Sequence, residues 1–325
     1  MEARTRNLPQ SSALDVYRTM VTIREFEEAA GKLMARAQIP GAVHLYVGQE
    51  AIAAGVCTQL NDDDYITSTH RGHGHLIAKA GDIRLMYAEL FGKATGYCHG
   101  KGGSMHVADI GIGMLGANGI VGGGAPIAVG AAYTAMVKGN GQVAICFMGD
   151  GASNHGTFHE AANLAASRRL PCIFVFENNL YGEWTPQNKH QAIEDIATRA
   201  AGYGMPGEIA DGQDVTSVYA AAATAIQRAR RGDGPTLLEF KTYRYYDHVG
   251  IDSGSKSRPA EEIEHWRSRD PLLLFSEKMR TAGLIDRDRE QLIEAEVRES
   301  IEEAIRFAEE SPDPEPTDLL VDVYS

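Results

Sequence analysis

Two short, uninterrupted apolar segments with a helix-like segment between them constrain the fold of this chain more than any other feature. The apolar segments are QVAICFMGD at 142–150 and CIFVFENN at 172–179, and the alanine-rich residues 156–169 lie between them. Strands that are apolar at every position are buried on both faces, which is typical of parallel sheets covered by helices. We therefore predict an α/β fold whose sheet is mainly parallel, with helices on both faces.

The flanking regions predict further elements around this centre. Helical spacing of apolar residues or alanine-rich composition predicts helices at 13–37, 49–60, 125–139 and 215–230, and a strand is expected at 235–245. From residue 259 the pattern becomes charged and helical, and it ends in a proline-rich tail. We expect three parts, namely an N-terminal helical arm (1–40), an α/β domain that binds the cofactor (41–258), and a C-terminal helical region with a tail (259–325).

Composition excludes some functions. The chain has 325 residues and a formal net charge of −13, so a nucleic acid partner would be repelled. No apolar run approaches the roughly 20 residues that a membrane helix needs, so we expect no membrane partner. Residues 1–12 lack the apolar core of a signal peptide, and we expect a cytoplasmic protein.

Polar side chains stand where the two apolar strands end. Asp150 lies in a Gly-Asp-Gly turn after the first strand, and Asn179 follows the second. Ligands of open parallel sheets bind outside the carboxyl ends of the strands, so these side chains face one crevice if the strands are neighbours. Carboxylate and amide oxygens suit Mg²⁺, which takes its other ligands from phosphate and water.

A predicted helix start and two glycines indicate that the crevice beside Asp150 and Asn179 also binds an anion. The helix expected from Gly156 would direct its N-terminal amides there, and Gly149 and Gly151 would let a phosphate approach the backbone. These features predict a diphosphate site. The chain has no GxxxxGK[ST] loop for ATP. A nicotinamide dehydrogenase that uses GIVGGG at 119–124 is the rival interpretation, although neither a strand nor an acid about 20 residues later is expected there.

The Gly-Asp-Gly turn and Asn178-Asn179 are separated by 26 residues. This pattern resembles the binding motif of thiamine diphosphate (ThDP) enzymes. Further segments resemble the E1 α subunits of 2-oxo acid and acetoin dehydrogenases along nearly the whole chain: HLYVGQEA (44–51), ITSTHRGHGH (66–75), GKGGSMH (100–106), GANGIVGGG (116–124), LPCIFVFENNLYG (170–182) and TYRYYDH (242–248).

The resemblance implies roles for individual residues. Mg²⁺ would be held by Asp150, Asn179 and the carbonyl of Tyr181, and His106 and His248 would be the catalytic histidines. Residues implied to bind ThDP are His70, Arg71, Gly119, Val121, Gly149, Asp150, Gly151, Ala152, Asn179, Tyr181 and His248.

Plainer interpretations of some histidines stay open. His70, His73 and His75 could form a metal cluster or, more simply, hydrogen-bond a phosphate or the backbone. His44 could be a structural histidine.

Two positions depart from the family pattern. Many relatives have tyrosine at the place of His70, although the THRGHGH form resembles the acetoin dehydrogenase branch. Around His248, Asp247 and Val249 replace a glycine and a serine that kinases modify in mitochondrial relatives, so phosphorylation control is not expected there. An acid beside His248 would raise the pKa of the histidine or alter the choice of substrate. The segment that departs from the family pattern around His248 extends from Tyr245 to Asp252.

The resemblance also implies partners. A complete ThDP enzyme needs a second α/β domain with a glutamate that activates the cofactor. In the E1 family, a separate β subunit supplies both. We therefore expect an α₂β₂ heterotetramer that cleaves acetoin or decarboxylates a 2-oxo acid such as pyruvate, and that passes the acyl unit to a lipoyl-bearing E2 acyltransferase. A non-catalytic subunit that binds ThDP without turnover is the alternative.

Overall fold

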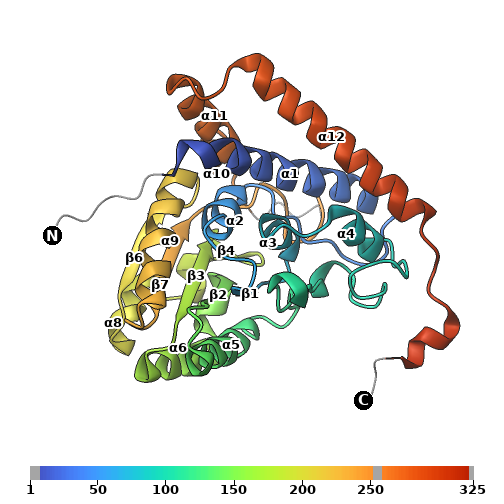
Figure 1. The fold of residues 1–325 in the computed structure, drawn as a ribbon. Coiled ribbons are helices and arrows are strands. Elements are labelled where there is room, and N and C mark those ends of the chain that lie inside the picture. The colour runs from blue at the N-terminus through green and yellow to red at the C-terminus, as the bar shows by residue number, and fades with distance from the viewer. Residues whose placement is uncertain (1–7, 252–257, 322–325) are drawn as a thin grey trace.

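A five-stranded sheet forms the centre of the computed structural model, which describes residues 8–251 and 258–321 (Figure 1). All its neighbouring strands are parallel. In sheet order the strands are β1 (Tyr65–Thr67), β2 (Ala144–Gly149), β3 (Cys172–Asn178), β7 (Thr236–Lys241) and β6 (Gly207–Asp211). The predicted α/β fold with a parallel sheet is confirmed, and the two apolar segments are the adjacent strands β2 and β3.

Alternation along the strands directs side chains to two separate cores. Cys146 of β2 belongs to a core beneath α5 (Gly124–Lys138) and α6 (Gly156–Arg168), whereas its neighbour Phe147 belongs to the larger core on the opposite face. Figure 1 shows α5 and α6 below the sheet, with α2 (Glu50–Cys57), α9 (Val215–Arg230) and α1 (Gln10–Ala35) on the other side. Helices therefore cover both faces, which explains why β2 and the first five residues of β3 are apolar.

The remaining elements connect and surround these layers. The helices are α3 (Gly72–Ala78), α4 (Ile83–Leu90), α7 (Gln187–His190), α8 (Ala200–Tyr203), α10 (Ala260–Arg267), α11 (Pro271–Thr281) and α12 (Arg287–Glu310). A small antiparallel pair consists of β4 (Tyr181–Gly182) and β5 (Thr185–Pro186).

The last predicted strand is shorter than expected. We expected it to reach residue 245, but β7 ends at Lys241. Lys241 is paired with Asn178 of β3 on one side and with Asp211 of β6 on the other, and both neighbours end at these residues. Because no strand continues on either side, the chain leaves the sheet after Lys241, at the carboxyl edge.

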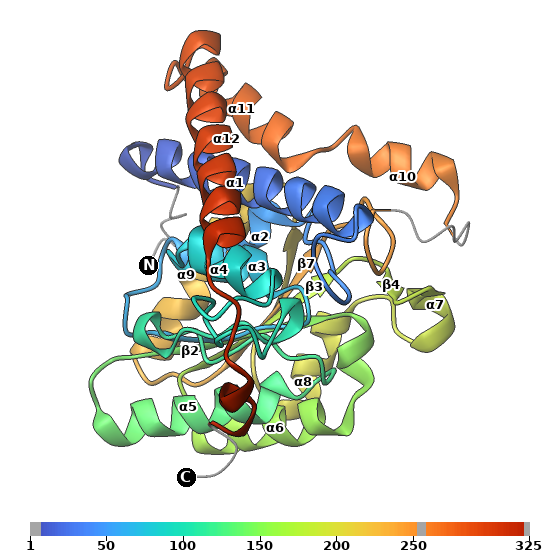
Figure 2. The same ribbon diagram turned by 90° about the vertical axis from the view of Figure 1, so that its right-hand side faces the viewer.

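The terminal helices belong to the same hydrophobic core as the sheet. One buried cluster includes Tyr17 of α1, Ile145 of β2 and Ile301 of α12. Figure 2 shows α12 crossing α1, and α12 also contacts α4. Within the described residues, no helix is long and apolar enough to cross a membrane. The division at residues 40 and 258 stays a prediction.

Candidate functional site

A cavity of about 400 Å³ opens at the carboxyl edge of the sheet. Its walls come from the segments that follow β1, β2, β3 and β7, together with the loop before α2 and the loop before α5. Among the residues that line it are His44, Gln49, His70, Arg71, Gly119, Val121, Gly149, Asp150, Gly151, Ala152, His155, Glu177, Asn179, Tyr181, Arg244 and His248.

Asp150 and Asn179 lie side by side in this cavity because β2 and β3 are neighbours in register. Gly149, which precedes Asp150, is paired with Glu177, which is two residues before Asn179. Both side chains are buried, at 1% and 6% exposure. The Asn179 side-chain oxygen accepts the N–H of Tyr181 at 3.3 Å. The prediction that these two side chains face one crevice at the carboxyl ends of neighbouring strands is thus confirmed. Their role as metal ligands stays a prediction.

A tight turn before α2 brings Gln49 against Asn179. Gln49 is completely buried, and its side-chain oxygen accepts an N–H of the Asn179 amide at 3.1 Å. The turn needs Gly48, whose φ is +98° and whose absent Cβ would lie 2.4 Å from the carbonyl oxygen of Tyr243. The two oxygens of Glu50 accept the N–H of Gly48 at 3.1 Å. The backbone at residues 48–50 is therefore held independently of the Gln49 side chain.

Two buried guanidinium groups give the cavity a positive character. Arg71 donates to the carbonyl oxygens of Leu45 and His248 at 2.8 and 3.0 Å. Arg244 donates to the carbonyl oxygen of Glu183 at 2.8 Å, but its Nε and Nη1 have no hydrogen-bond partner among the described residues. Burial, and then the charge of Arg258, lower the pKa of Arg244 to about 10. Cations that are desolvated in this way favour an anionic ligand.

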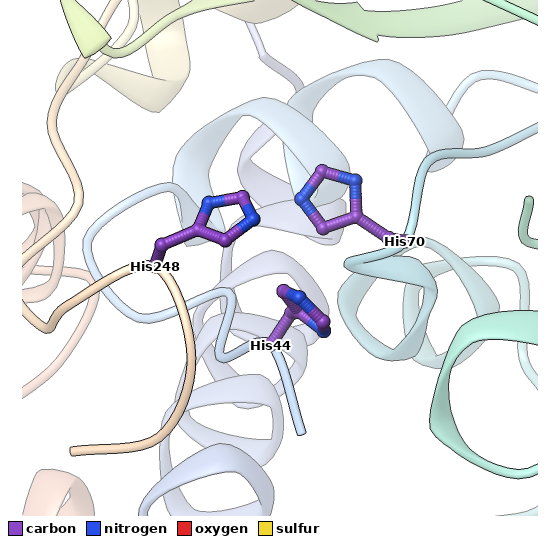
Figure 3. Close-up of side chains that lie close together, drawn as sticks. All are labelled: His44, His70 and His248. Carbon is purple, nitrogen blue, oxygen red and sulfur yellow. The ribbon is translucent and has the colours of Figure 1, made fainter. Parts of the chain in front are cut away.

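Three histidines from distant segments meet beside these arginines. Figure 3 shows His44, His70 and His248 pointing toward one another, and one ring nitrogen of each lies within 4.8 Å of the others. Burial, followed by the charge of Arg71, lowers the pKa of His44 and His248 to about 3 and lowers that of His70 as well. All three rings are therefore neutral near pH 7. They are suited to hydrogen bonding in the neutral form, because burial and the nearby cations disfavour their protonation.

The nearby histidines of the same sequence segment point elsewhere. His73 lies 3.2 Å from Glu27, and His75 lies 3.0 Å from Glu177, both in the buried interior. The alternative metal cluster of His70, His73 and His75 is therefore not formed.

The expected rise in the pKa of His248 is wrong, and the alternative effect of Asp247, on the choice of substrate, stays a prediction. The Asp247 carboxylate lies 3.7 Å from Arg258, so its charge is partly balanced by that cation. The pKa of His248 is lowered by burial, Arg71 and Arg244, whereas an adjacent acid was expected to raise it. Asp252, the last residue of this unusual segment, lies outside the described residues.

His106 stands near the cavity but does not line it. Its Nδ1 lies 3.1 Å from the carbonyl oxygen of Gly102, and its Nε2 would lie 3.2 Å from a Cβ built on Gly119. Its neighbour Met105 lines the cavity instead. The other predicted site residues, from His70 to His248, all line the cavity, and the catalytic role of His106 stays a prediction.

Sequence reasoning missed Gln49 and Arg244, which line the cavity, and His190, which lies outside the lining but contacts Asp150. Arg244 comes three residues after β7, and it was missed because the expected strand extended to residue 245 and placed Arg244 inside it. His190 lies 3.1 Å from the Asp150 carboxylate. Gln49 and His190 carry no local signal, because loops that fold back over the sheet bring them there.

The donors and acceptors of the cavity fit a diphosphate with a hard cation. Asp150 and Asn179 offer oxygen ligands, and Arg71 and Arg244 supply positive charge. Gln49 Nε2 and His70 Nε2 are buried without a hydrogen-bond partner in the described part of the chain, as are two nitrogens of Arg244. Buried donors of this kind cost free energy unless a ligand satisfies them. The fold and the cavity thus define an α/β protein that binds an anionic cofactor at the edge of its sheet.

Comparison with known proteins agrees with this class. The dehydrogenase E1 component family matches residues 18–317. The α subunit of acetoin:2,6-dichlorophenolindophenol oxidoreductase from Bacillus subtilis (strain 168) is 52% identical over 320 residues, which is 98% of this chain and 95% of that protein. The corresponding subunit from Cupriavidus necator is 49% identical over 318 residues, with the same coverage. The α subunit of the pyruvate dehydrogenase E1 component from Rhizobium meliloti (strain 1021) is 38% identical and covers 95% of this chain and 89% of its own length.

This chain belongs to the dehydrogenase E1 component family and is the α subunit of a thiamine diphosphate-dependent oxidoreductase. The rival interpretation as a nicotinamide dehydrogenase is excluded by this membership. The loop at 119–124 opens α5, as a dinucleotide loop would open a helix, but it follows the short 3₁₀ turn Ile110–Ile112 and irregular chain rather than a strand.

Proposed function

We propose that this chain is the α subunit of an acetoin-cleaving E1 enzyme. The observation that carries the proposal is the gap between 52% identity to an acetoin oxidoreductase α subunit and 38% identity to pyruvate dehydrogenase α subunits, at similar coverage. Pyruvate is the second candidate because the same cavity residues would serve a 2-oxo acid.

The cofactor and its metal have defined positions in this proposal. Asp150, Asn179 and the carbonyl of Tyr181 would hold Mg²⁺, which suits oxygen ligands and needs phosphate oxygens to complete its shell. Arg71 and Arg244 would neutralise the diphosphate, with the backbone at Gly151 and Ala152 close to it. ThDP would supply the electron sink for breaking the carbon–carbon bond beside the substrate carbonyl.

The neutral histidines would form hydrogen bonds to the substrate. His44 and His248 both have a pKa lowered to about 3, so near pH 7 each is neutral and can accept a hydrogen bond from a substrate hydroxyl. The Nη2 atom of Arg71 lies 3.2 Å from Nδ1 of His248, and this contact restricts the orientation of the imidazole ring. His106, near Gly119, would act from the outer side of the same cavity.

A β subunit completes the proposed enzyme. The rim of the cavity carries Ile120 and Val121 at 72% and 44% exposure, and α5 continues from it with Ile127, Met136 and Val137 exposed. Exposed apolar residues on the rim of the cavity and along one helix are typical of a protein interface. The relatives are named as α subunits, which implies another subunit. We assign this surface to a β subunit that supplies the activating glutamate in an α₂β₂ assembly, and a lipoyl-bearing E2 to the next step.

The test is a co-expression assay. The chain is purified alone and with its transketolase-like β partner, and dichlorophenolindophenol reduction is measured with acetoin, pyruvate and 2-oxoisovalerate, with and without ThDP and Mg²⁺. We expect activity only for the assembled enzyme with ThDP, and the highest kcat/KM for acetoin. A preference for pyruvate would overturn the substrate assignment. ThDP binding without turnover of any substrate would support the non-catalytic alternative.

A further inference from the structure

Gln49 has the features of a residue that serves the cofactor site without belonging to the strand-end motif. It is completely buried and lines the cavity. Its two side-chain atoms do different things: the oxygen accepts an N–H of Asn179 at 3.1 Å, and the nitrogen has no partner among residues 8–251 and 258–321. A buried amide that is only half satisfied is uncommon and calls for a ligand.

We propose that Gln49 is a positioning residue that orients the Asn179 amide for the metal and offers its own free N–H to the anionic cofactor. An asparagine whose nitrogen is bound on one side presents its oxygen on the other, so the contact to Gln49 selects the orientation in which Asn179 offers an oxygen to a cation. The inference rests on the proposed Mg²⁺–ThDP site.

The turn that carries Gln49 is braced from several directions. Glu50 accepts the Gly48 N–H and pairs with Arg24 at 2.6 Å, and the Thr242 hydroxyl donates to the Gly48 carbonyl oxygen at 3.2 Å. None of these contacts uses the Gln49 side chain. Replacing that side chain therefore leaves the turn in place, and its effect can be measured on a folded protein.

Two substitutions separate the two roles. Gln49→Glu keeps the size and an oxygen that can accept from Asn179, but it removes the N–H donor and places a negative charge near the diphosphate. Gln49→Met has a similar size and removes both the acceptor and the donor. Gln142→Met is the matched control, because Gln142 is also buried, at 6% exposure, but bonds to the backbone oxygen of Asp63 and does not line the cavity.

The experiment uses the assembled complex with its β subunit. ThDP binding at saturating Mg²⁺ is measured by calorimetry, and Mn²⁺ binding at saturating ThDP is measured by electron paramagnetic resonance. We expect both affinities to fall at least about tenfold in Gln49→Met, the size of one lost buried hydrogen bond. In Gln49→Glu we expect only ThDP affinity to fall by that amount, with Mn²⁺ affinity within about threefold of the wild type.

Each outcome has a defined meaning. Wild-type affinities in Gln49→Met would overturn the inference, and so would equal losses in Gln49→Met and Gln142→Met. A loss of Mn²⁺ affinity in Gln49→Glu as large as in Gln49→Met would overturn the orienting role. A wild-type complex that binds no ThDP would instead overturn the proposed function itself.

Discussion

Arg24 of α1 and Glu50 of α2 form an ion pair at 2.6 Å in which the Glu50 side chain is completely buried. Arg24 also pairs with Asp270, which precedes α11, at 2.9 Å. Since Glu50 in turn holds the N–H of Gly48, the pair connects the N-terminal arm and the C-terminal helices to the turn that lines the cavity. The arm is thus part of the support of the site.

The first prediction concerns this pair. Arg24→Met should destabilise the protein by about 3 kcal/mol, because it leaves a buried carboxylate without its cation. Chemical denaturation of the purified chain measures the change. Arg84→Met is the control, since Arg84 forms an exposed pair with Asp82 and its loss should change the stability much less. A similar effect of both substitutions would contradict the buried-pair argument.

The second prediction concerns the metal. Asp150→Ala should abolish Mg²⁺-dependent ThDP binding, because a carboxylate ligand is lost, while the circular dichroism spectrum and the melting temperature stay close to the wild type. Calorimetric titration with ThDP in the presence and absence of Mg²⁺ provides the measurement. The exposed acid Asp63 serves as a control when replaced by alanine. Unchanged ThDP affinity in Asp150→Ala would refute the site assignment.

The third prediction separates binding from stability. Arg244→Met should weaken ThDP binding at least about tenfold through the loss of a charge-assisted contact. The same change should not lower the stability of the cofactor-free protein, because Arg244 is a buried cation whose pKa is lowered to about 10 by burial and by Arg258. Thermal unfolding without ThDP tests the second part. A large loss of stability would show that Arg244 is mainly a structural residue.

The fourth prediction concerns pH. His44 and His248 have a pKa of about 3 in the folded protein, against an ordinary value of 6.5. Between these values the unfolded chain binds more protons than the folded one, so stability decreases as the pH falls from about 6.5 towards 3. Urea midpoints of the cofactor-free chain between pH 7 and pH 5 should show this decrease. A double variant, His44→Gln with His248→Gln, should have a flatter pH dependence, and an equal slope would exclude these residues as its source.

The fifth prediction concerns the cysteines. Burial raises the pKa of Cys57 and Cys146 to about 12, and Cys172 is also completely buried. Cys98 is only partly buried and lies in the loop that carries Met105. Burial also raises the pKa of Cys98, so its accessibility, and not an activated thiolate, should make it the one thiol of the four that reacts with a disulfide reagent in the native protein. Cys98→Ser should remove this reaction, and rapid modification of two or more thiols in the wild type would contradict the burial.

The parts of the fold predicted most accurately are those with the strongest local patterns. The apolar segments of β2 and β3 and the alanine-rich α9 have the predicted type, and α9 has the predicted bounds. β1 has only three residues, and β6 is largely exposed, so neither has an apolar pattern long enough to be predicted. Their existence depends on pairing with β2 and β7, which is a long-range interaction.

Local patterns in the sequence were enough to predict the class of fold and the two residues at one edge of the site. Continuous apolar strands require burial on both faces, and the chemistry at their ends predicted Asp150 and Asn179 because strand direction alone places such residues at one edge. Which other groups lie beside them depends on long-range packing of the folded chain. His44, Gln49 and Arg244 come from segments far apart in the chain, and they converge with His248, which the family resemblance had already implied. Their convergence depends on loops that the core and the buried Arg24–Glu50 pair hold over the sheet. Burial in that arrangement, rather than the neighbouring residue Asp247, decides that the histidines are neutral.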